Sequence, residues 1–271
     1  GSTLADLPAL ASALRMAADD GLVDVVGAWS HMSRADDPSE AGNASTASHV
    51  RIFEEGLAIL ADAGVTPRIR HLSATSGILW HREAHYDMVR AGIGLYGLSP
   101  DPAVATSEQL GLTPALELSA PLTSVKVIEE GTPASYGGTW VAPTRRWIGL
   151  VPLGYGDGIL RAASNQARVV VHTASGPFNA PLIGRVCMDQ FMVDLGPAEG
   201  SPGTPTARSG QAPAIPGDIA TLFGSGIGGE ALADDWAQAA GTINYEIVTH
   251  LGAHIPRIYR DGADATFGSN S

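Results

Sequence analysis

The pattern of apolar residues changes near residue 100, and this change limits the folds open to the chain. The first third alternates helical periodicity with short apolar runs; over Ser45–Ala63, for example, Val50 and Phe53 begin one apolar helical face. Such alternation predicts βαβ units and a parallel sheet. The segments expected in order are a helix at 6–21, a strand at Leu22–Gly27, a helix at Ser45–Ala63, a strand at Arg68–Leu72, a short helix at Ile78–His85 and a strand at Met88–Tyr96.

After Pro100 the apolar runs are short and are separated by Gly, Pro and Thr, which predicts a mostly β domain. Strands are expected at Leu122–Ile128, Trp147–Val151, Arg168–His172, Leu182–Cys187, Phe191–Leu195 and Ile219–Phe223, with one helix near Glu230–Ala239. Gly196–Gly217 is rich in Pro, Gly, Ser and Ala and is expected to be a loop without a core of its own. We therefore expect an α/β part over residues 1–110 and an all-β part over residues 111–271.

The charge balance argues against nucleic acid as a partner. The 271 residues include 16 Lys and Arg against 28 Asp and Glu, a formal net charge of −12, whereas nucleic-acid affinity comes mostly from cations that neutralise phosphates. No apolar stretch reaches the roughly 18–20 residues of a membrane helix, so a membrane is not expected either, and the cytoplasm is the expected location. Cys187 is the single cysteine, which leaves no intrachain disulfide framework, and Lys126 is the single lysine.

Two local motifs suggest dinucleotide binding and metal binding, but the sequence around each motif does not support these functions. Gly224–Gly229 matches G-x-G-x-x-G, but the second strand of a dinucleotide-binding unit does not follow, which favours a glycine-rich turn. His81 and His85 are spaced i, i+4, yet the residue order around Glu83 is not that of a zinc protease and no third ligand is evident. An exposed helical face is expected there, and no metal site.

Several polar or glycine-rich segments follow expected strands, where βα barrels place their active sites, or form glycine-rich turns in the β part. Each one, taken alone, is typical of a turn or a core element. They are His31, Ser73–Thr75, Arg90–Ile93, Ser135–Trp140, Gly154–Gly158, Gly184–Gln190 and Ile243–Glu246.

Taken together and in order, these segments resemble the fold-type III alanine racemases, enzymes that depend on pyridoxal phosphate (PLP). Five blocks carry the resemblance, which covers nearly the whole chain: Met-Val-Arg-Ala-Gly-Ile-x-Leu-Tyr-Gly at 88–97, Ser-Tyr-Gly-x-Thr-Trp at 135–140, Leu-Gly-Tyr-x-Asp-Gly at 153–158, Gly-Arg-Val-Cys-Met-Asp-Gln at 184–190 and Thr-Ile-Asn-Tyr-Glu-Ile at 242–247. The resemblance implies the C-terminal half of a PLP-binding (β/α)8 TIM barrel over 1–110 and a C-terminal β domain over 111–271. It also implies a head-to-tail homodimer that interconverts L-alanine and D-alanine, supplying D-alanine for cell-wall peptidoglycan.

The resemblance also assigns roles to residues. Arg90 matches the arginine that faces the pyridine nitrogen of PLP; because a guanidinium only donates hydrogen bonds, that nitrogen stays unprotonated and the cofactor is a weaker electron sink. Tyr136 matches the base that removes the α-proton of the L-isomer from the partner subunit, and His31 and His71 match two histidines that link this tyrosine to Arg90. The remaining matches are Thr75, Gly92, Ile93 and Tyr245 at the phosphate, Met188 and Asp189 at the substrate, and Tyr155, Asp36, Arg161, Arg185 and Ile243 along the access corridor.

Two departures from the family pattern bear on activity. Ala74-Thr75 stands where the family often has Asn-Ser, so one amide contact to the cofactor is lost. The family's N-terminal blocks, which carry the lysine that binds PLP covalently, do not occur here, and alternation places Lys126 on the solvent side of a β-domain strand. We therefore expect a truncated chain that is inactive alone. The alternatives are an inactive paralogue or half-protein that binds a complementary half, and a racemase for another small amino acid such as serine.

Overall fold

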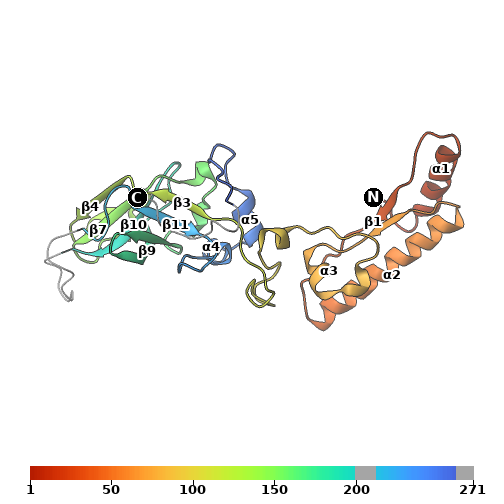
Figure 1. Cartoon of the computed structure of the whole chain (residues 1–271), viewed down its shortest axis with the longest axis horizontal. Coiled ribbons are helices and arrows are strands. Elements are labelled where there is room, and N and C mark those ends of the chain that lie inside the picture. The colour runs from red at the N-terminus through yellow and green to blue at the C-terminus, as the bar shows by residue number, and fades with distance from the viewer. Residues whose placement is uncertain (199–211, 261–271) are drawn as a thin grey trace. The chain divides into compact units, whose positions relative to one another are not determined.

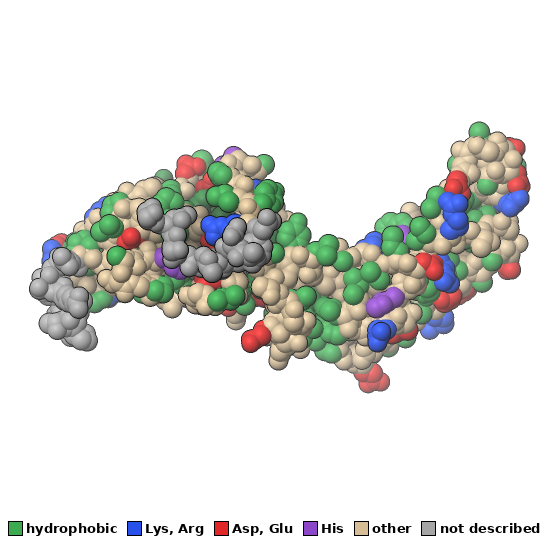
Figure 2. Space-filling view, viewed as in Figure 1, with side chains coloured by type: hydrophobic (Ala, Val, Ile, Leu, Met, Phe, Trp, Pro, Cys, Tyr) green, Lys and Arg blue, Asp and Glu red, His purple; other side chains and the backbone are tan. Residues whose placement is uncertain are grey.

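The computed structural model describes residues 1–198 and 212–260, and the chain divides into two compact units, Gly1–Thr113 and Pro114–Ser271 (Figure 1). Within the described residues, no helix is long and apolar enough to cross a bilayer. On the face that Figure 2 shows, acidic and basic side chains are interspersed and form no continuous basic surface.

The first unit consists of helices joined to a short parallel sheet. Its strands β1 (Gly27–Trp29) and β2 (Ile69–His71) pair in parallel, with Gly27 opposite Ile69. The helical elements are α1 (Leu7–Asp19), α2 (Glu40–Asp62), α3 (Thr75–Trp80) and the 3-10 turns η1 (Arg82–Ala84) and η2 (Ile93–Tyr96). Two small apolar cores hold these elements together. In one, Ala11 of α1 packs against Leu60 of α2 and Val65, and in the other, Phe53 of α2 packs against Met32 and Leu72.

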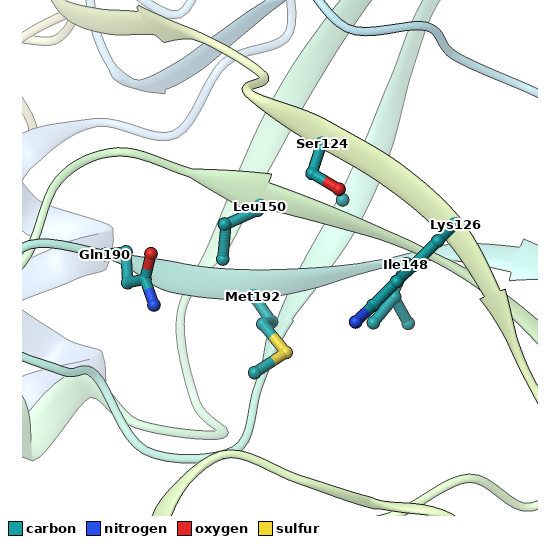
Figure 3. A pocket seen from close by; sticks show the side chains of 7 residues that line it. Ser124, Lys126, Ile148, Leu150, Gln190 and Met192 are labelled. Atoms are coloured by element: carbon teal, nitrogen blue, oxygen red, sulfur yellow. The ribbon is translucent and has the colours of Figure 1, made fainter.

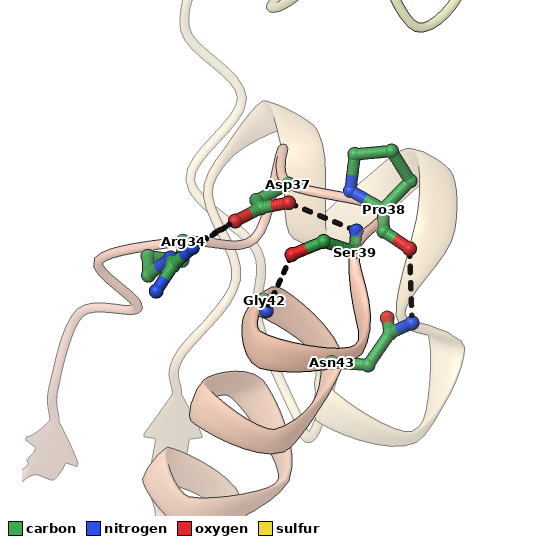
Figure 4. A network of polar contacts seen from close by, with 6 residues as sticks. All are labelled: Arg34, Asp37, Pro38, Ser39, Gly42 and Asn43. Carbon is green, nitrogen blue, oxygen red and sulfur yellow. Dashed lines mark hydrogen bonds and ion pairs between the residues drawn. The ribbon is translucent and has the colours of Figure 1, made fainter.

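Helix α2 begins five residues before the expected Ser45 because the segment ahead of it is a strong cap. The Ser39 hydroxyl accepts a hydrogen bond from the Gly42 amide at 3.1 Å, and the Asp37 carboxylate accepts one from the Ser39 amide at 2.9 Å (Figure 4). Arg34 pairs with the same carboxylate. Hydrogen bonds from Ser39, followed by that from Arg34, lower the pKa of Asp37 to about 2.

Two of the strands expected in the first unit are wrong in place or in kind. The first strand covers Gly27–Trp29 rather than Leu22–Gly27. Met88–Tyr96 is not a strand: it is irregular and ends in η2. The reason is a contact with a residue outside the segment: the Thr75 hydroxyl accepts the amides of Gly92 and Gly94 at 3.1 and 3.4 Å, and those amides are then not available to a sheet.

The second unit is built on one antiparallel sheet of seven strands in the order β3-β11-β8-β9-β10-β7-β4 (Figure 1). The strands are β3 (Leu118–Pro121), β4 (Ser124–Ile128), β7 (Arg146–Val151), β8 (Arg168–Thr173), β9 (Gly176–Ile183), β10 (Phe191–Pro197) and β11 (Ile219–Phe223). A hairpin of β5 (Pro133–Ala134) and β6 (Trp140–Val141), three 3-10 turns (η3 Tyr136–Gly138, η4 Tyr155–Asp157, η5 Arg161–Ala163) and two helices (α4 Ala233–Ala240, α5 Asn244–Thr249) complete it.

Helix α4 is fixed on this sheet by one buried aromatic residue. The Trp236 indole donates a hydrogen bond to Leu222 O at 2.6 Å and meets Phe191 edge-on, with the ring centroids 6.3 Å apart. Val169, Val170 and Val171 of β8 are all buried, so both faces of the sheet are covered at its centre. The β domain expected from the short apolar runs is therefore confirmed.

The expected strands of this unit agree with the structure except at one turn. Leu182–Cys187 is wrong as a strand, because β9 ends at Ile183 and Gly184 turns the chain with φ +70°. The loop expected over Gly196–Gly217 falls partly on residues 199–211, outside the described residues. Lys126 is exposed on β4, where it lines a shallow pocket with Ile148 and Met192 (Figure 3).

Candidate active site

Arg90 is the centre of a polar cluster at the ends of β1 and β2. Its Nη1 donates to His71 Nδ1 at 2.9 Å, and its Nη2 lies 3.0 Å from His31 Nδ1. The same Nη2 also reaches the carbonyls of Ser30 and Leu72 at 2.9 and 3.1 Å. Since a guanidinium can only donate, both histidines must accept through Nδ1 and carry their ring proton on Nε2.

Trp29 covers this cluster on one side, a role that the sequence patterns did not indicate. The Arg90 guanidinium carbon lies 5.2 Å from the centre of the indole, and the His71 ring stacks on Trp29 with an interplanar angle of 14°. Burial lowers the pKa of Arg90. Burial, and then the positive charge of Arg90, also lower the pKa of His71, which keeps this imidazole neutral and able to accept. The structure thus brings together His31, His71 and Arg90.

Thr75 and the glycines after Arg90 form a second feature of the first unit, which we call the threonine cradle (Thr75, Gly92, Ile93 and Gly94). Besides the two amides that its hydroxyl accepts, Thr75 packs so closely that a Cβ on Gly94 would lie 2.9 Å from its Cγ2. The Arg90 amide donates to Ser73 O at 2.9 Å, which fixes the cradle beside the arginine cluster. Tyr245, expected at the same phosphate, lies in α5 of the second unit.

In the second unit, Tyr136 projects from a turn of unusual backbone conformation. Ser135 has φ +61°, and Gly137 and Gly138 follow with φ +74° and +55°. The Ser135 hydroxyl donates to Arg185 O at 2.6 Å, and the Arg185 guanidinium packs beneath Gly137. The Tyr136 side chain is 71% exposed, so the turn presents its phenol to solvent in a single chain.

The Tyr155 turn and the Met188 segment are locked together through their backbones. Tyr155 N donates to Cys187 O at 2.9 Å, and Gly156 N donates to Met188 O at 2.8 Å. A Cβ on Gly156 would lie 3.5 Å from Asp189 Oδ1. The structure therefore brings Tyr155, Met188 and Asp189 together, and it leaves Met188 more than half exposed.

Asp157 and His254 close the other side of the Tyr155 turn. Asp157 belongs to the sequence block at 153–158 but had no role assigned to it, and His254 was not indicated by the sequence patterns. The Asp157 carboxylate accepts from Gly154 N at 2.7 Å and contacts His254 Nε2 at 2.7 Å. The Gly252 amide donates to Asp157 O at 2.9 Å, so the end of the described chain is fastened to this turn.

The other corridor candidates are distributed over both units. Asp36 is exposed in the loop before α2, and Arg161 begins η5. Ile243 precedes α5 and is 62% exposed.

The two motifs judged unsupported by their context have other partners in the structure. The Gly224–Gly229 loop folds around the buried Glu230 carboxylate, which accepts from Gly226 N at 2.9 Å and Ser225 Oγ at 3.1 Å, so the loop already holds an anion. His81 and His85 are not on an exposed helical face as expected. They are partly buried, with His81 Nε2 2.9 Å from Ala35 O and His85 Nε2 3.0 Å from Ile78 O. The described residues contain no cluster of three or more metal-ligating side chains.

A parallel βα unit followed by an antiparallel β domain, with an arginine–histidine cluster in the first and a tyrosine turn in the second, agrees with the class that the sequence resembles, the fold-type III PLP enzymes. Comparison with known proteins narrows this class. Residues 1–100 match the family "Alanine racemase, N-terminal domain", and residues 115–259 match "Alanine racemase, C-terminal domain". The chain belongs to the alanine racemase family.

Individual relatives agree with this family. The chain is 42% identical to an alanine racemase of Salinispora arenicola over 260 residues, which is 96% of this chain and 63% of that protein. The crystal structure of alanine racemase from D-cycloserine-producing Streptomyces lavendulae matches with a TM-score of 0.84 at 39% identity, covering 95% of this chain and 62% of that one. The enzyme from Streptomyces coelicolor A3(2) matches with a TM-score of 0.82 at 41% identity, covering 94% and 61%. The chain thus spans somewhat less than two thirds of these relatives, and the expected fold of half a barrel plus a β domain is confirmed.

Proposed function

We propose that this chain contributes most of the active site of a PLP-dependent racemase that interconverts L-alanine and D-alanine. The observation that carries the proposal is the Arg90 cluster, in which a guanidinium is fixed by two histidines and two carbonyls. A donor-only group held this firmly suits an unprotonated ring nitrogen better than it suits a carboxylate, for which an open, two-pronged fork is the preferred geometry.

The residues of the first unit fit PLP. The Thr75 hydroxyl oxygen accepts the Gly92 and Gly94 amides, so its proton is left to donate to a phosphate dianion. A side chain on Gly94 would collide with Thr75, so a glycine is needed to keep this backbone close to the hydroxyl. We assign Thr75, Gly92, Ile93 and Tyr245 to the phosphate and Arg90 to the pyridine nitrogen. PLP, when bound, delocalises the negative charge that develops on the α-carbon of an amino acid.

The residues of the second unit supply acid–base chemistry and substrate contacts in this proposal. Tyr136 takes the α-proton of the L-isomer at its phenolic oxygen and returns it in the reverse direction. Met188 and Asp189 line the substrate pocket, where the Met188 amide meets the substrate carboxylate. Tyr155, Asp36, Arg161, Arg185 and Ile243 line the corridor and favour a small side chain.

His31 and His71 hold Arg90 in place, and through it they form the network that makes a tyrosine usable as a base. A free tyrosine has a pKa near 10, so it needs a nearby cation or donors to lose its proton near neutral pH. Both imidazoles have Nε2–H groups that remain available to extend this network, because their Nδ1 atoms are occupied by Arg90.

We further propose that two copies of the chain pack head to tail, so that Tyr136 and Met188 serve the partner's arginine cluster. The high exposure of both side chains in a single chain supports this. Cys187 has a free thiol, which is compatible with a reducing compartment and supports the cytoplasm as the location.

Lys126 is not assigned as the covalent anchor of PLP. It is exposed on β4, where it lines a pocket with Ser124, Ile148 and Met192 (Figure 3), and no other cation lines this pocket to activate it as a nucleophile. The lysine of the working site then comes from outside the 271 residues.

The experiment measures alanine racemisation by the purified chain with PLP, alone and with the part of the Salinispora arenicola relative that this chain does not match supplied as a separate polypeptide. Activity in the mixture supports the proposal. PLP binding without activity in either sample would favour a half-protein that only binds its complement. Turnover of serine but not alanine would change the substrate.

Tyr136→Phe tests the assignment of the base. The variant removes only the hydroxyl, so we expect L-to-D conversion to fall by at least about 100-fold while PLP binding, followed by its absorbance, is unchanged. Tyr259→Phe is the control, because that tyrosine is 92% exposed and has no assigned role. Loss of PLP binding in Tyr136→Phe would mean that Tyr136 is a cofactor residue and not the base.

A further inference from the structure

We propose that Asn165 is a positioning residue that fixes the Tyr136 turn against the Met188 segment. Asn165 lies just after η5 and belongs to none of the five sequence blocks that resemble the family. Its Nδ2 donates to Thr139 Oγ1 at 3.1 Å, and its Oδ1 accepts from Gly184 N at 2.6 Å. One side chain therefore spans the segment that carries Tyr136 and the segment that carries Met188.

The orientation of this amide follows from its partners. Gly184 N–H can only donate, so the Asn165 oxygen must face it, and the nitrogen must then face the Thr139 hydroxyl. Asn165 also has φ +62°, in the left-handed region that asparagine tolerates better than most residues. A backbone held in a costly conformation by two hydrogen bonds of its own side chain is typical of a residue whose geometry matters.

Neighbouring hydrogen bonds also fix the segment that leads to Met188. The hydroxyl of Ser164, the residue before Asn165, accepts from Val186 N at 3.0 Å, and the Ser135 hydroxyl donates to Arg185 O. Segment 184–187 is thus held by its amides on one side and by a carbonyl on the other. Asn165 is the one residue among these contacts that also reaches past Ser135 to the far end of the tyrosine turn, at Thr139.

The consequence concerns distance. Tyr136 must reach the α-carbon of a substrate whose carboxylate lies at the Met188 amide, an argument that rests on the proposed function. The two groups are a few residues from Thr139 and Gly184, so the Asn165 bridge, together with the contacts of Ser135 Oγ to Arg185 O and Cys187 Sγ, sets their separation. Misplacement of a reacting group by about 1 Å lowers the rate on the order of 100-fold. Loss of one Asn165 hydrogen bond should displace Tyr136 by less than this and lower the rate by a smaller factor.

A double-mutant cycle of Asn165→Gly and Thr139→Val tests the bridge in the full chain. Glycine keeps the left-handed backbone and removes both hydrogen bonds, and valine keeps the shape of threonine and removes the hydroxyl. Amide exchange measured by mass spectrometry should rise by about 2- to 10-fold over 136–140 in each single variant, the effect of one lost hydrogen bond. The double variant should exceed Asn165→Gly by little. The Gly184 amide should lose protection in Asn165→Gly and keep it in Thr139→Val.

Kinetics of the complemented enzyme then separate positioning from stability. Thr139→Val should lower kcat about 3- to 10-fold with KM unchanged, because the Gly184 contact and therefore the Met188 amide stay in place. Thr139→Ser and Asn165→Asp should restore kcat, since a hydroxyl can donate to the aspartate and the aspartate still accepts from Gly184. Thr173→Val, which removes a hydroxyl from the β8–β9 turn of the same unit, is the matched control and should leave exchange over 136–140 and kcat unchanged.

The exchange experiments test whether Asn165 joins the two segments, and the kinetics test whether this contact positions Tyr136. Additive effects on exchange in the cycle, or unchanged exchange over 136–140 in Thr139→Val, would overturn the bridge. A normal kcat in Asn165→Gly, in an enzyme that racemises alanine, would overturn its positioning role. If the wild-type enzyme does not racemise alanine, the proposed function fails, and the exchange cycle alone decides whether Asn165 joins the two segments.

Discussion

Gly154→Ala should disrupt the contact between the Tyr155 turn and the Met188 segment, because no space exists for one more methyl group. A Cβ on Gly154 would lie 2.2 Å from Met188 O and 2.4 Å from Cys187 O. Both are backbone atoms, so no side-chain rotation relieves the overlap. Since non-bonded heavy atoms settle near 3.5 Å, the two segments must move apart by about 1 Å.

Such a displacement breaks both backbone hydrogen bonds that join the segments, those from Tyr155 N and Gly156 N. Each is worth about 1 kcal/mol net, and the overpacking adds about 1–3 kcal/mol, so the free energy of unfolding should fall by about 3–5 kcal/mol. In molecules that remain folded, the Met188 amide is displaced by about 1 Å, which predicts a loss of up to about 100-fold in alanine racemisation.

Urea unfolding of the chain, and initial racemisation rates of the chain mixed with the complementary polypeptide, give the two quantities. Gly156→Ala is the control two residues away. Its Cβ would lie 3.1 Å from Met188 O, so a shift of a few tenths of an ångström suffices and the effect on both assays should be small. The reasoning is refuted if Gly154→Ala unfolds at the wild-type urea concentration, or if the two variants are equally impaired.

Three further outcomes follow from the first unit. Gly42→Ala should destabilise the chain, because its Cβ would lie 2.1 Å from Asp37 O; Gly56→Ala in the same helix meets only the tip of a leucine side chain at 3.3 Å and should be neutral or slightly stabilising in thermal unfolding. Thr75→Val should weaken PLP binding about 10- to 100-fold in a fluorescence titration, and Thr75→Ser should not, because a hydrogen bond to a charged group is worth about 1.5–3 kcal/mol. Because the pKa of His71 is lowered in the folded chain, the unfolded chain binds a proton at His71 at a higher pH than the folded chain does. The contribution of neutral His71 to the free energy of unfolding is therefore present above about pH 6.5 and is lost as the pH falls below that value. His71→Gln should flatten the dependence of the unfolding free energy on pH just below pH 6.5, and an unchanged slope would contradict the assignment.

Periodicity predicted the elements that bury one face, and it failed where side chains compete for the backbone. The helix around Phe53 and the strand at Arg168–His172 are in place because their apolar residues repeat with the right period. Met88–Tyr96 is equally apolar, yet the Thr75 hydroxyl takes its amides and no strand forms. A hydroxyl 17 residues away in sequence is invisible to a pattern confined to the segment itself.

The candidate site likewise contains residues that the sequence indicated and residues that only the structure revealed. Residues that resemble family blocks, such as Arg90 and Tyr136, could be selected by their identity and order. Trp29 could not, because a tryptophan in a short strand is typical of a core, and only the fold places its ring against Arg90. His254 pairs with Asp157, 97 residues away, and nothing local to either residue indicates the other.

Backbone strain gives the sharpest case of information that sequence patterns do not contain. Of the described residues, only Tyr86, Ser135 and Asn165 are non-glycines with positive φ, and two of these three lie in the network around the Tyr136 turn. Such conformations cost about 1–3 kcal/mol each and persist only where the surroundings enforce them. Ser135 is held by Arg185 O, and Asn165 by Thr139 and Gly184. Both strained residues of the second unit therefore hold the turn that carries the exposed Tyr136, and a single misplaced contact there would release part of that strain and move the phenol.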